Sequence, residues 1–249
     1  MKILIIGGTG LIGTMVARNL TKLGHDVIPG SPTNGIDALT GTGLDEAMAG
    51  TDIIIDLANS KSFDDAPALD FFQTAGRNLI AAKSKASVKH HVALSIVGVD
   101  RMQNMGYMRA KKMQEDLIKA SGTPYTIIRS TQFLEFVPTV AAIGTQGNDV
   151  YVSDISFQPI AAVDVAAFVT EFALEQPTNA LEEIAGPEKD DLINFVTAYL
   201  KQNDSAKKII PTDKHEYFGA TIAKSALVPE GSAHLGKVAM KEWLSGKII

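Results

Sequence analysis

The chain has no cysteine among its 249 residues. Disulfide bonds, thiolate nucleophiles and cysteine-based metal sites are therefore excluded. Five histidines are present, but they lack the spacing of metal ligands, so we predict no metal centre. These residues are His25, His90, His91, His215 and His234.

Long apolar runs and basic clusters are missing as well. No stretch is long and apolar enough to cross a bilayer, and a buried strand is expected from Met1 onward. We therefore expect no signal peptide and no membrane partner, and predict a cytoplasmic protein. The formal net charge is -5 and basic residues do not gather in any one segment, which argues against direct nucleic-acid binding.

What is present fits a globular protein with a sizeable core. Hydrophobic residues make up 45% of the chain and charged residues 20%, as in an ordinary globular domain. The length allows one large domain, or one domain with a small lobe.

The N-terminal segment carries the strongest motif. The unbroken apolar run Ile3–Ile6 predicts a strand buried on both faces. A helix follows, with apolar residues at helical spacing from Ile12 to Leu23 and Gly24 at its end. Four glycines lie in the turn and the first helical residues: Gly7, Gly8, Gly10 and Gly13.

A strand, a glycine-rich turn and a helix form the context of a dinucleotide site. The pyrophosphate must approach backbone N–H groups at the helix N-terminus, where the helix dipole favours an anion. A side chain at Gly8 or Gly10 would block that approach, and Gly13 would let the helix lie close to the strand. The glycines match both G-x-G-x-x-G and the G-x-x-G-x-x-G of extended and atypical short-chain dehydrogenases; the alternative is a tight turn in another α/β protein.

The loop after the second strand, His25–Pro29, bears on cofactor choice. Enzymes that use NAD usually carry an acidic residue there, and this loop has neither an acidic residue nor an arginine. Ser31, Thr33 and Asn34 can donate hydrogen bonds without repelling a phosphate. The loop therefore favours NADP and leaves NAD possible; the alternative is a polar turn that contacts nothing.

Strands and helices alternate through the first half of the chain, which predicts a doubly wound parallel sheet. The expected elements include a degenerate strand at Gly35–Leu39, a helix from Leu44, strands at Asp52–Asn59, His91–Val97 and Tyr125–Arg129, and helices at Leu69–Ala82 and Tyr107–Ser121. Leu57, Ala58 and Asn59 end a strand and should face the cofactor crevice, because open parallel sheets bind ligands beyond the carboxyl ends of their strands.

The pattern loosens after residue 130. We expect a helix over Val165–Leu174 capped by Asp164, a strand at Glu183–Ala185, a helix at Leu192–Leu200, an irregular tail over Asn203–Gly236 and a closing helix at Lys237–Leu244. The predicted fold is an α/β Rossmann core over residues 1–150, with 158–186 returning to the sheet. Residues 187–249 form a small C-terminal α+β substrate lobe.

A candidate catalytic group lies between residues 95 and 111. Tyr107 and Lys111 are four residues apart near the start of a helix, which puts both side chains on one face. The Lys111 ammonium can lower the pKa of the Tyr107 phenol and bond the nicotinamide ribose, so that the phenol gives a proton to a carbonyl that receives hydride. Ser95 ends a predicted strand and can hold the substrate oxygen. The alternative is a surface tyrosine and a solvated lysine.

These residues resemble the NmrA-like group of atypical short-chain dehydrogenases/reductases. The resemblance runs along the whole chain and is carried by Gly7–Gly13, Leu57–Ser60, Ser95–Arg101, Tyr107–Lys111, Tyr125–Phe133 and Ala185–Glu188. It implies cofactor contacts from the glycine turn, the Ser31 loop, the end of the third strand, Lys111 and the segment after Arg129. The residues concerned are Gly7, Thr9, Gly10, Leu11, Ile12, Gly13, Ser31, Thr33, Leu57, Ala58, Asn59, Lys111 and Thr131.

Two positions depart from the group's pattern: the basic residue often found after the second strand is missing, and the proline common after Arg129 is Ser130. The predicted function is an NAD(P)H-dependent oxidoreductase that transfers hydride to a small, fairly apolar carbonyl or quinone-like acceptor, as a monomer or homodimer. One alternative is a non-catalytic NAD(P)-binding redox sensor. Another is an enzyme like the nucleotide-sugar epimerases, against which the short C-terminal lobe counts.

Overall fold

A computed structural model describes residues 1–203 and 206–246, which form two compact units. The first unit comprises Met1–Arg129 and Val165–Glu182, and the second Ser130–Asp164 and Glu183–Ile249. Residues 130–150, which we assigned to the Rossmann core, belong to the second unit. Positions 204–205 of the predicted tail and 247–249 of the predicted lobe lie outside the described residues.

The main sheet confirms the doubly wound α/β fold. Its seven strands run in the order β14-β9-β5-β4-β3-β1-β2. They are β1 (Lys2–Ile6), β2 (Asp26–Gly30), β3 (Ile53–Asp56), β4 (His90–Ile96), β5 (Tyr125–Ser130), β9 (Leu181–Ala185) and β14 (His234–Leu235). β1 pairs in parallel with both β2 and β3. The chain thus passes from β1 to one neighbour and then to the other, and such a switch point is where open parallel sheets bind ligands.

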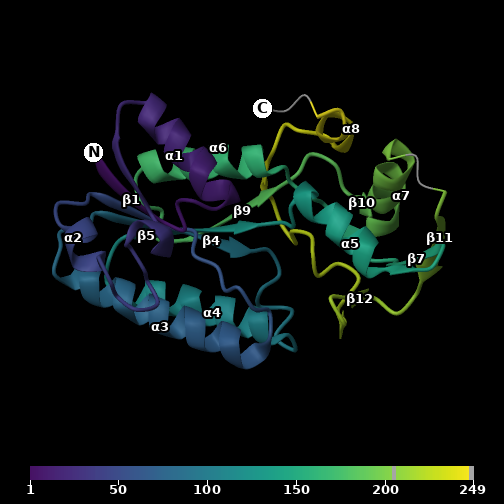
Figure 1. Cartoon of the computed structure of the whole chain (residues 1–249), viewed down its shortest axis with the longest axis horizontal. Helices are drawn as coiled ribbons and strands as arrows, with labels where there is room; N and C mark the ends of the chain where they lie inside the picture. The colour runs from purple at the N-terminus through teal and green to yellow at the C-terminus, as the bar shows by residue number, and fades with distance from the viewer. Residues whose placement is uncertain (204–205, 247–249) are drawn as a thin grey trace. The chain divides into compact units, whose positions relative to one another are not determined.

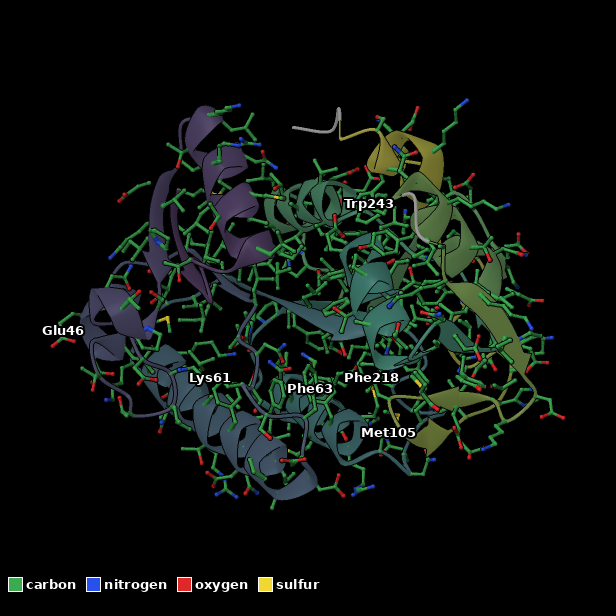
Figure 2. All side chains as sticks on the ribbon, turned by 45° about the vertical axis from the view of Figure 1, so that its right-hand side comes forward. Glu46, Lys61, Phe63, Met105, Phe218 and Trp243 are labelled. Atoms are coloured by element: carbon green, nitrogen blue, oxygen red, sulfur yellow. The ribbon has the colours of Figure 1, made fainter. Side chains whose placement is uncertain are left out.

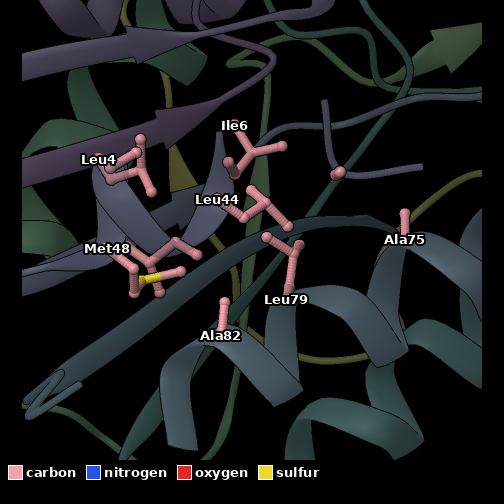
Figure 3. Close-up of a cluster of buried hydrophobic side chains, with 10 residues drawn as sticks. Leu4, Ile6, Leu44, Met48, Ala75, Leu79 and Ala82 are labelled. Carbon is pink, nitrogen blue, oxygen red and sulfur yellow. The ribbon is translucent and has the colours of Figure 1, made fainter. Parts of the chain in front are cut away.

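Helices cover both faces of this sheet. In Figure 1, α1 (Leu11–Lys22) and α6 (Ala162–Leu174) lie on one side, and α3 (Asp65–Ser84) and α4 (Gly106–Ala120) on the other. The short helix α2 (Leu44–Met48) joins a buried cluster with β1 and α3, whose side chains Figure 3 shows. None of the described helices is both long enough and apolar enough to cross a membrane.

The degenerate strand expected at Gly35–Leu39 is not formed. A 3₁₀ turn, η1 (Pro32–Asn34), follows β2 instead, and the chain continues through turns to α2. Gly35 and Gly41 have φ of 84° and 80°, which interrupts extended backbone. The Asp37 carboxylate accepts the Leu39 N–H at 2.8 Å, a local bond that competes with strand pairing.

The second unit is built from short elements. They are η2 (Leu134–Phe136), α5 (Val137–Ile143), α7 (Leu192–Gln202), α8 (Met240–Leu244), β6 (Thr145–Gln146), β7 (Asp149–Ser153), β8 (Ser156–Phe157), β10 (Asp190–Asp191), β11 (Lys208–Thr212), β12 (Glu216–Tyr217) and β13 (Ala220–Thr221). The tail that we expected to be irregular therefore contains strands, and β11 pairs in parallel with β7. Strands of two to five residues are too short for a periodic signal.

Asp164 does not cap the helix that follows it, contrary to our expectation. Helix α6 begins at Ala162, and both carboxylate oxygens of Glu135 accept the Ala162 N–H at 3.1 Å. One carboxylate oxygen of Asp164 instead accepts the N–H groups of Lys237 and Val238, both at 2.9 Å. The capping carboxylate thus comes from a residue 27 positions upstream, a pairing that local sequence does not reveal.

Acid is expected to destabilise the first unit through His90. Burial lowers the pKa of His90 to about 4, whereas an unfolded histidine titrates near 6.5. Above pH 6.5 the neutral ring therefore makes its full contribution to the free energy of unfolding. This contribution is lost as the pH falls toward 4, and the loss is about 1–3 kcal/mol. Urea unfolding at pH 7.5 and 4.5 should show this loss, and His90→Gln should reduce it. The control is His234→Gln, which alters an exposed histidine. If both variants lose the same unfolding free energy between pH 7.5 and 4.5, His90 is not the cause of the acid sensitivity.

Candidate functional site

The glycine turn between β1 and α1 is packed too closely for side chains at three positions. Gly7 has a φ of 76°, and a Cβ on it would lie 2.7 Å from the Leu57 carbonyl oxygen. A Cβ on Gly13 would lie 2.2 Å from the carbonyl oxygen of Gly7, so α1 packs closely against the turn that follows β1. A Cβ on Gly8 would lie 2.5 Å from the Cα of Pro29. Gly8 is thus required by packing against β2, a different reason from the one we predicted.

Gly10 differs from these three glycines. A Cβ there would meet only the Gly7 carbonyl oxygen, at 3.3 Å. Gly10 is the N-cap of α1, without a side-chain cap and without an acidic residue in the first turn. The Gly10 carbonyl accepts the Thr14 N–H at 2.9 Å, so the amides of residues 11–13 precede the first such bond. This end of α1 fits a diphosphate, because its amides and the helix dipole both favour an anion.

The structure brings the other two expected cofactor segments to this turn. The Gly8 N–H donates to the Gly30 carbonyl at 3.0 Å, at the end of β2, and the Leu57 N–H donates to the Ile6 carbonyl at 2.9 Å. Ser31 is buried, and its hydroxyl bonds Thr33 Oγ1 at 2.8 Å, whereas Thr33 is exposed. Of these two hydroxyl side chains, Thr33 is the one more accessible to a ligand.

Tyr107 lies beside the loop that follows β3. Its hydroxyl donates to Asn59 Oδ1 at 2.7 Å. Its ring lies 5.0 Å from the ring of Phe63, labelled in Figure 2, and 5.9 Å from that of Phe72. Burial raises the pKa of the Tyr107 phenol to about 12, and the hydrogen bond to Asn59 opposes this only in part. The shift is opposite to the lowering that we predicted from Lys111.

Lys111 is buried within the first unit. Its Nζ donates to the Leu94 carbonyl at 2.8 Å and to Gln114 Oε1 at 2.5 Å, and it lies 4.9 Å from the centre of the Phe72 ring. Gln114 in turn donates to Asp56 Oδ2 at 2.7 Å. Burial lowers the pKa of Lys111 to about 8, although Asp56 and Glu115 oppose the shift. The ammonium is thus engaged with a buried polar network instead of with the Tyr107 hydroxyl.

Ser95 belongs to a second buried network. Its hydroxyl donates to Glu115 Oε1 at 2.6 Å. The two Glu115 carboxylate oxygens also accept from Arg129 Nε and Nη2, both at 2.9 Å, and Arg129 bonds Asp100 at 3.0 Å. A hydroxyl has one hydrogen to donate, and Ser95 gives it to Glu115. In this arrangement Ser95 has none left for a substrate oxygen.

Sequence reasoning missed Gln114 and Glu115, although one signal was available. Glu115 follows Lys111 by four residues, so both lie on one face of α4. In the second unit, Thr131 is buried, and its backbone N–H donates to the Ile184 carbonyl at 3.0 Å. Its Oγ1 has no hydrogen-bond partner among the described residues.

Comparisons with known proteins identify the family of the chain. The model of the NAD(P)H-binding family matches residues 14–176. The chain is 24% identical over 196 residues to photosystem II assembly factor Ycf39 of Cyanophora paradoxa, covering 72% of this chain and 61% of that protein. It is 26% identical over 225 residues to divinyl chlorophyllide a 8-vinyl-reductase of Cucumis sativus, covering 75% and 53%. The chain thus spans little more than half the length of these relatives.

Solved structures share the fold. A dTDP-4-dehydrorhamnose reductase from Clostridium acetobutylicum superposes with a TM-score of 0.75 at 19% identity, over 100% of this chain and 94% of that one. The protein RMD from Pseudomonas aeruginosa, complexed with NADPH, gives a TM-score of 0.70 at 14% identity, over 98% and 96%. At these identities the likeness establishes the fold alone.

Proposed function

The chain belongs to the NAD(P)H-binding family and has the Rossmann fold of an NmrA-like atypical short-chain dehydrogenase/reductase, and on this premise we propose that it reduces a small carbonyl or quinone-like acceptor. The observation that carries the proposal is the open N-terminus of α1, with Tyr107 held on Asn59 at the end of the neighbouring strand β3. The name of one relative, a vinyl-reductase, supports the reductase class.

The cofactor residues follow from the turn and its neighbours. The amides of Leu11, Ile12 and Gly13 would hold the diphosphate, and Thr9 and Gly10 would leave room for it. Leu57, Ala58 and Asn59 would contact the nucleotide at the end of β3. In the second unit, the buried Thr131 hydroxyl has no hydrogen-bond partner in the part of the chain that the structure describes, and a polar group of the ligand would satisfy it.

We also propose NADP as the preferred dinucleotide, with NAD possible. The loop from Gly30 to Gly35 contains no carboxylate that would repel a 2′-phosphate. Thr33 is exposed, and its hydroxyl can donate to such a phosphate in place of Ser31 Oγ, which it bonds at 2.8 Å.

When bound, NAD(P)H would supply the hydride that the acceptor carbon receives. Tyr107 would then turn its hydroxyl from Asn59 Oδ1 to the carbonyl oxygen and give it the proton, so that a hydride and a proton together convert a ketone to an alcohol. With a pKa near 12 the phenol stays protonated at neutral pH. It therefore carries a proton that it can give, although it is a weaker acid than a phenol in water. Lys111 and Ser95 would position the site through Gln114 and Glu115.

Tyr107→Phe is expected to separate the two acceptor classes. Ketone reduction needs a proton for the developing alkoxide, so kcat should fall by about 10²–10⁴-fold. Quinone reduction should be nearly unchanged, because the reduced oxyanion is already stable. Steady-state loss of NADPH absorbance with one ketone and one quinone measures both. The matched control Tyr151→Phe alters an exposed tyrosine of β7 and should leave both rates unchanged. If Tyr107→Phe reduces the ketone as fast as the unchanged chain does, Tyr107 is not the proton donor.

A second candidate is a protein that binds NAD(P) and senses it without turnover. The observation that favours it is that Ser95 and Lys111, two of the three predicted catalytic side chains, are bonded to buried partners. One relative is named as an assembly factor instead of an enzyme. A broad acceptor screen distinguishes the two candidates, since a sensor would bind dinucleotide and oxidise none of it. The cytoplasmic location and the monomer or homodimer stay predictions.

A further inference from the structure

The chain from Asp56, the last residue of β3, to Asn59 is bonded to helix α4 at both ends. Asp56 Oδ2 accepts a hydrogen bond from the Gln114 side-chain amide at 2.7 Å. Asn59 Oδ1 accepts one from the Tyr107 hydroxyl, also at 2.7 Å. Tyr107 and Gln114 are about two helical turns apart, so both lie on one face of α4. All of these residues belong to the first unit, and this face of α4 holds the short segment at two points.

The same carboxylate also bonds the backbone between these two points. Asp56 Oδ1 accepts the Ala58 N–H at 3.1 Å. The Leu57 N–H, one residue earlier, donates to the Ile6 carbonyl of β1 at 2.9 Å. The side chain of Asp56 is buried, and each of its oxygens accepts a hydrogen bond. One side chain thus joins α4 to the backbone of the segment that is proposed above to contact the nucleotide.

Lys111 sets the direction of the hydrogen bonds in this network. An ammonium can only donate, so Gln114 turns its oxygen toward Lys111, at 2.5 Å, and its nitrogen toward Asp56. Asp56 must then accept from both Gln114 and Ala58, which a carboxylate can do. Burial raises the pKa of the Asp56 carboxyl, but Lys111 and these two hydrogen bonds oppose the shift, because they favour the ionised form. An amide at position 56 has one oxygen, so it would point hydrogen atoms at one of the two donors.

We propose that Asp56 is a positioning residue of the reductase site, because it fixes the segment Leu57–Asn59 against α4. This segment would contact the nucleotide, and its last residue holds the hydroxyl of Tyr107, the proposed proton donor. The inference rests on the reductase function proposed above and adds to it a residue that acts through its neighbours. A misplacement of about 1 Å can cost on the order of 100-fold in rate, so a displaced segment should impair both dinucleotide binding and proton transfer.

Asp56→Asn is expected to weaken both steps, because it keeps the shape of the side chain but removes one acceptor. The Kd for NADPH should rise by about 3- to 10-fold, the scale of one lost hydrogen bond. At saturating NADPH, kcat for the ketone diacetyl should fall by about 10- to 100-fold. The kcat for the quinone menadione should change much less, because its reduction does not need the Tyr107 proton. Calorimetry measures the Kd, and loss of NADPH absorbance measures both kcat values.

The double variant Asp56→Asn with Gln114→Glu should restore both steps. It moves the carboxylate from β3 to α4 and keeps the net charge. The carboxylate at position 114 would accept from Lys111 and from the amide at position 56, whose oxygen still accepts the Ala58 N–H. Gln114→Glu alone puts two buried carboxyl groups in contact and should be impaired, because like charges disfavour each other. The effects of the two single variants should therefore cancel in large part.

Thr51→Val is the control for a loss of stability alone. Thr51 is buried just before β3 begins, and its hydroxyl donates to the Ala47 carbonyl at 2.8 Å. Thermal melts should show a lower melting temperature for this variant, as for Asp56→Asn. The Kd for NADPH and both kcat values should nevertheless match those of the unchanged chain. If one single variant of the network does not fold, the other is compared with the double variant.

Each outcome decides the proposal. A double variant that does not fold, or that is no better than the single variants, would overturn it, as would an Asp56→Asn that melts lower but keeps the Kd and kcat of the unchanged chain. If the unchanged chain binds NADPH but reduces no acceptor, the reductase function has failed and the Kd values decide. Binding that Asp56→Asn weakens and the double variant restores would then support Asp56 as a positioning residue for the dinucleotide. No binding of NADPH to the unchanged chain would overturn both proposals.

Discussion

Gly10→Asp is expected to abolish dinucleotide binding and to leave the fold intact. A Cβ at this position meets only the Gly7 carbonyl oxygen, at 3.3 Å, so the turn accepts a side chain when that carbonyl gives by a few tenths of an ångström. Aspartate is also a favoured N-cap, so α1 should be unchanged or slightly more stable. Its carboxylate would lie where the diphosphate must approach the helix amides, and like charges in close contact cost several kcal/mol. We expect the Kd for NADPH to rise by at least about 100-fold, or ~2.7 kcal/mol.

The control for this variant is Gly231→Asp. It adds the same charge at an exposed glycine of the second unit where a Cβ would have open space around it. Calorimetry with NADPH and a thermal melt on each variant separate binding from folding. If Gly10→Asp melts normally and binds NADPH as tightly as the Gly231→Asp control does, the diphosphate does not lie at the start of α1.

Glu115→Ala is expected to cause the largest loss of stability. Glu115 is 1% exposed and bonds Arg129, which is 5% exposed, through both carboxylate oxygens. Removing the carboxylate leaves a buried guanidinium without this partner and takes away the acceptor of the Ser95 hydroxyl. Breaking a buried ion pair in this way costs about 3–5 kcal/mol. Urea unfolding monitored by the fluorescence of the single tryptophan measures the change.

Two comparisons make that result interpretable. Asp45→Ala removes an exposed ion pair with Lys85, whose side chains are 58% and 64% exposed, and should cost under about 1 kcal/mol. The double variant Glu115→Leu with Arg129→Met removes both charges, and should be less destabilised than Glu115→Ala because no buried charge loses its partner. A loss below about 1 kcal/mol in Glu115→Ala would mean that this network does not support the fold.

Local sequence was enough to predict the dinucleotide turn but not the packing around it. The strand, the glycines and the helix are contiguous, so their order alone predicts the motif. The packing reason for Gly8 could not be predicted, because its neighbour, Pro29, comes from β2 and meets it only through tertiary packing. The prediction of a degenerate strand at Gly35–Leu39 was wrong because of local interactions. Glycines at positive φ and the hydrogen bond of the Asp37 carboxylate override a weak apolar pattern.

The candidate catalytic residues show the same limit. A spacing of four predicts that Tyr107 and Lys111 share a face of α4, but it does not reveal what each side chain meets there. Burial raises the pKa of Tyr107, and Lys111 bonds a strand carbonyl and Gln114.

Calorimetric titration of the unchanged chain with NADPH and NADH tests the central claim most directly. We predict saturable binding of one dinucleotide per chain in the micromolar range, tighter for NADPH than for NADH, because the loop from Gly30 to Gly35 contains no carboxylate. Absence of binding by either dinucleotide at about 1 mM, roughly the weakest affinity that counts as specific, would contradict a diphosphate site at the start of α1.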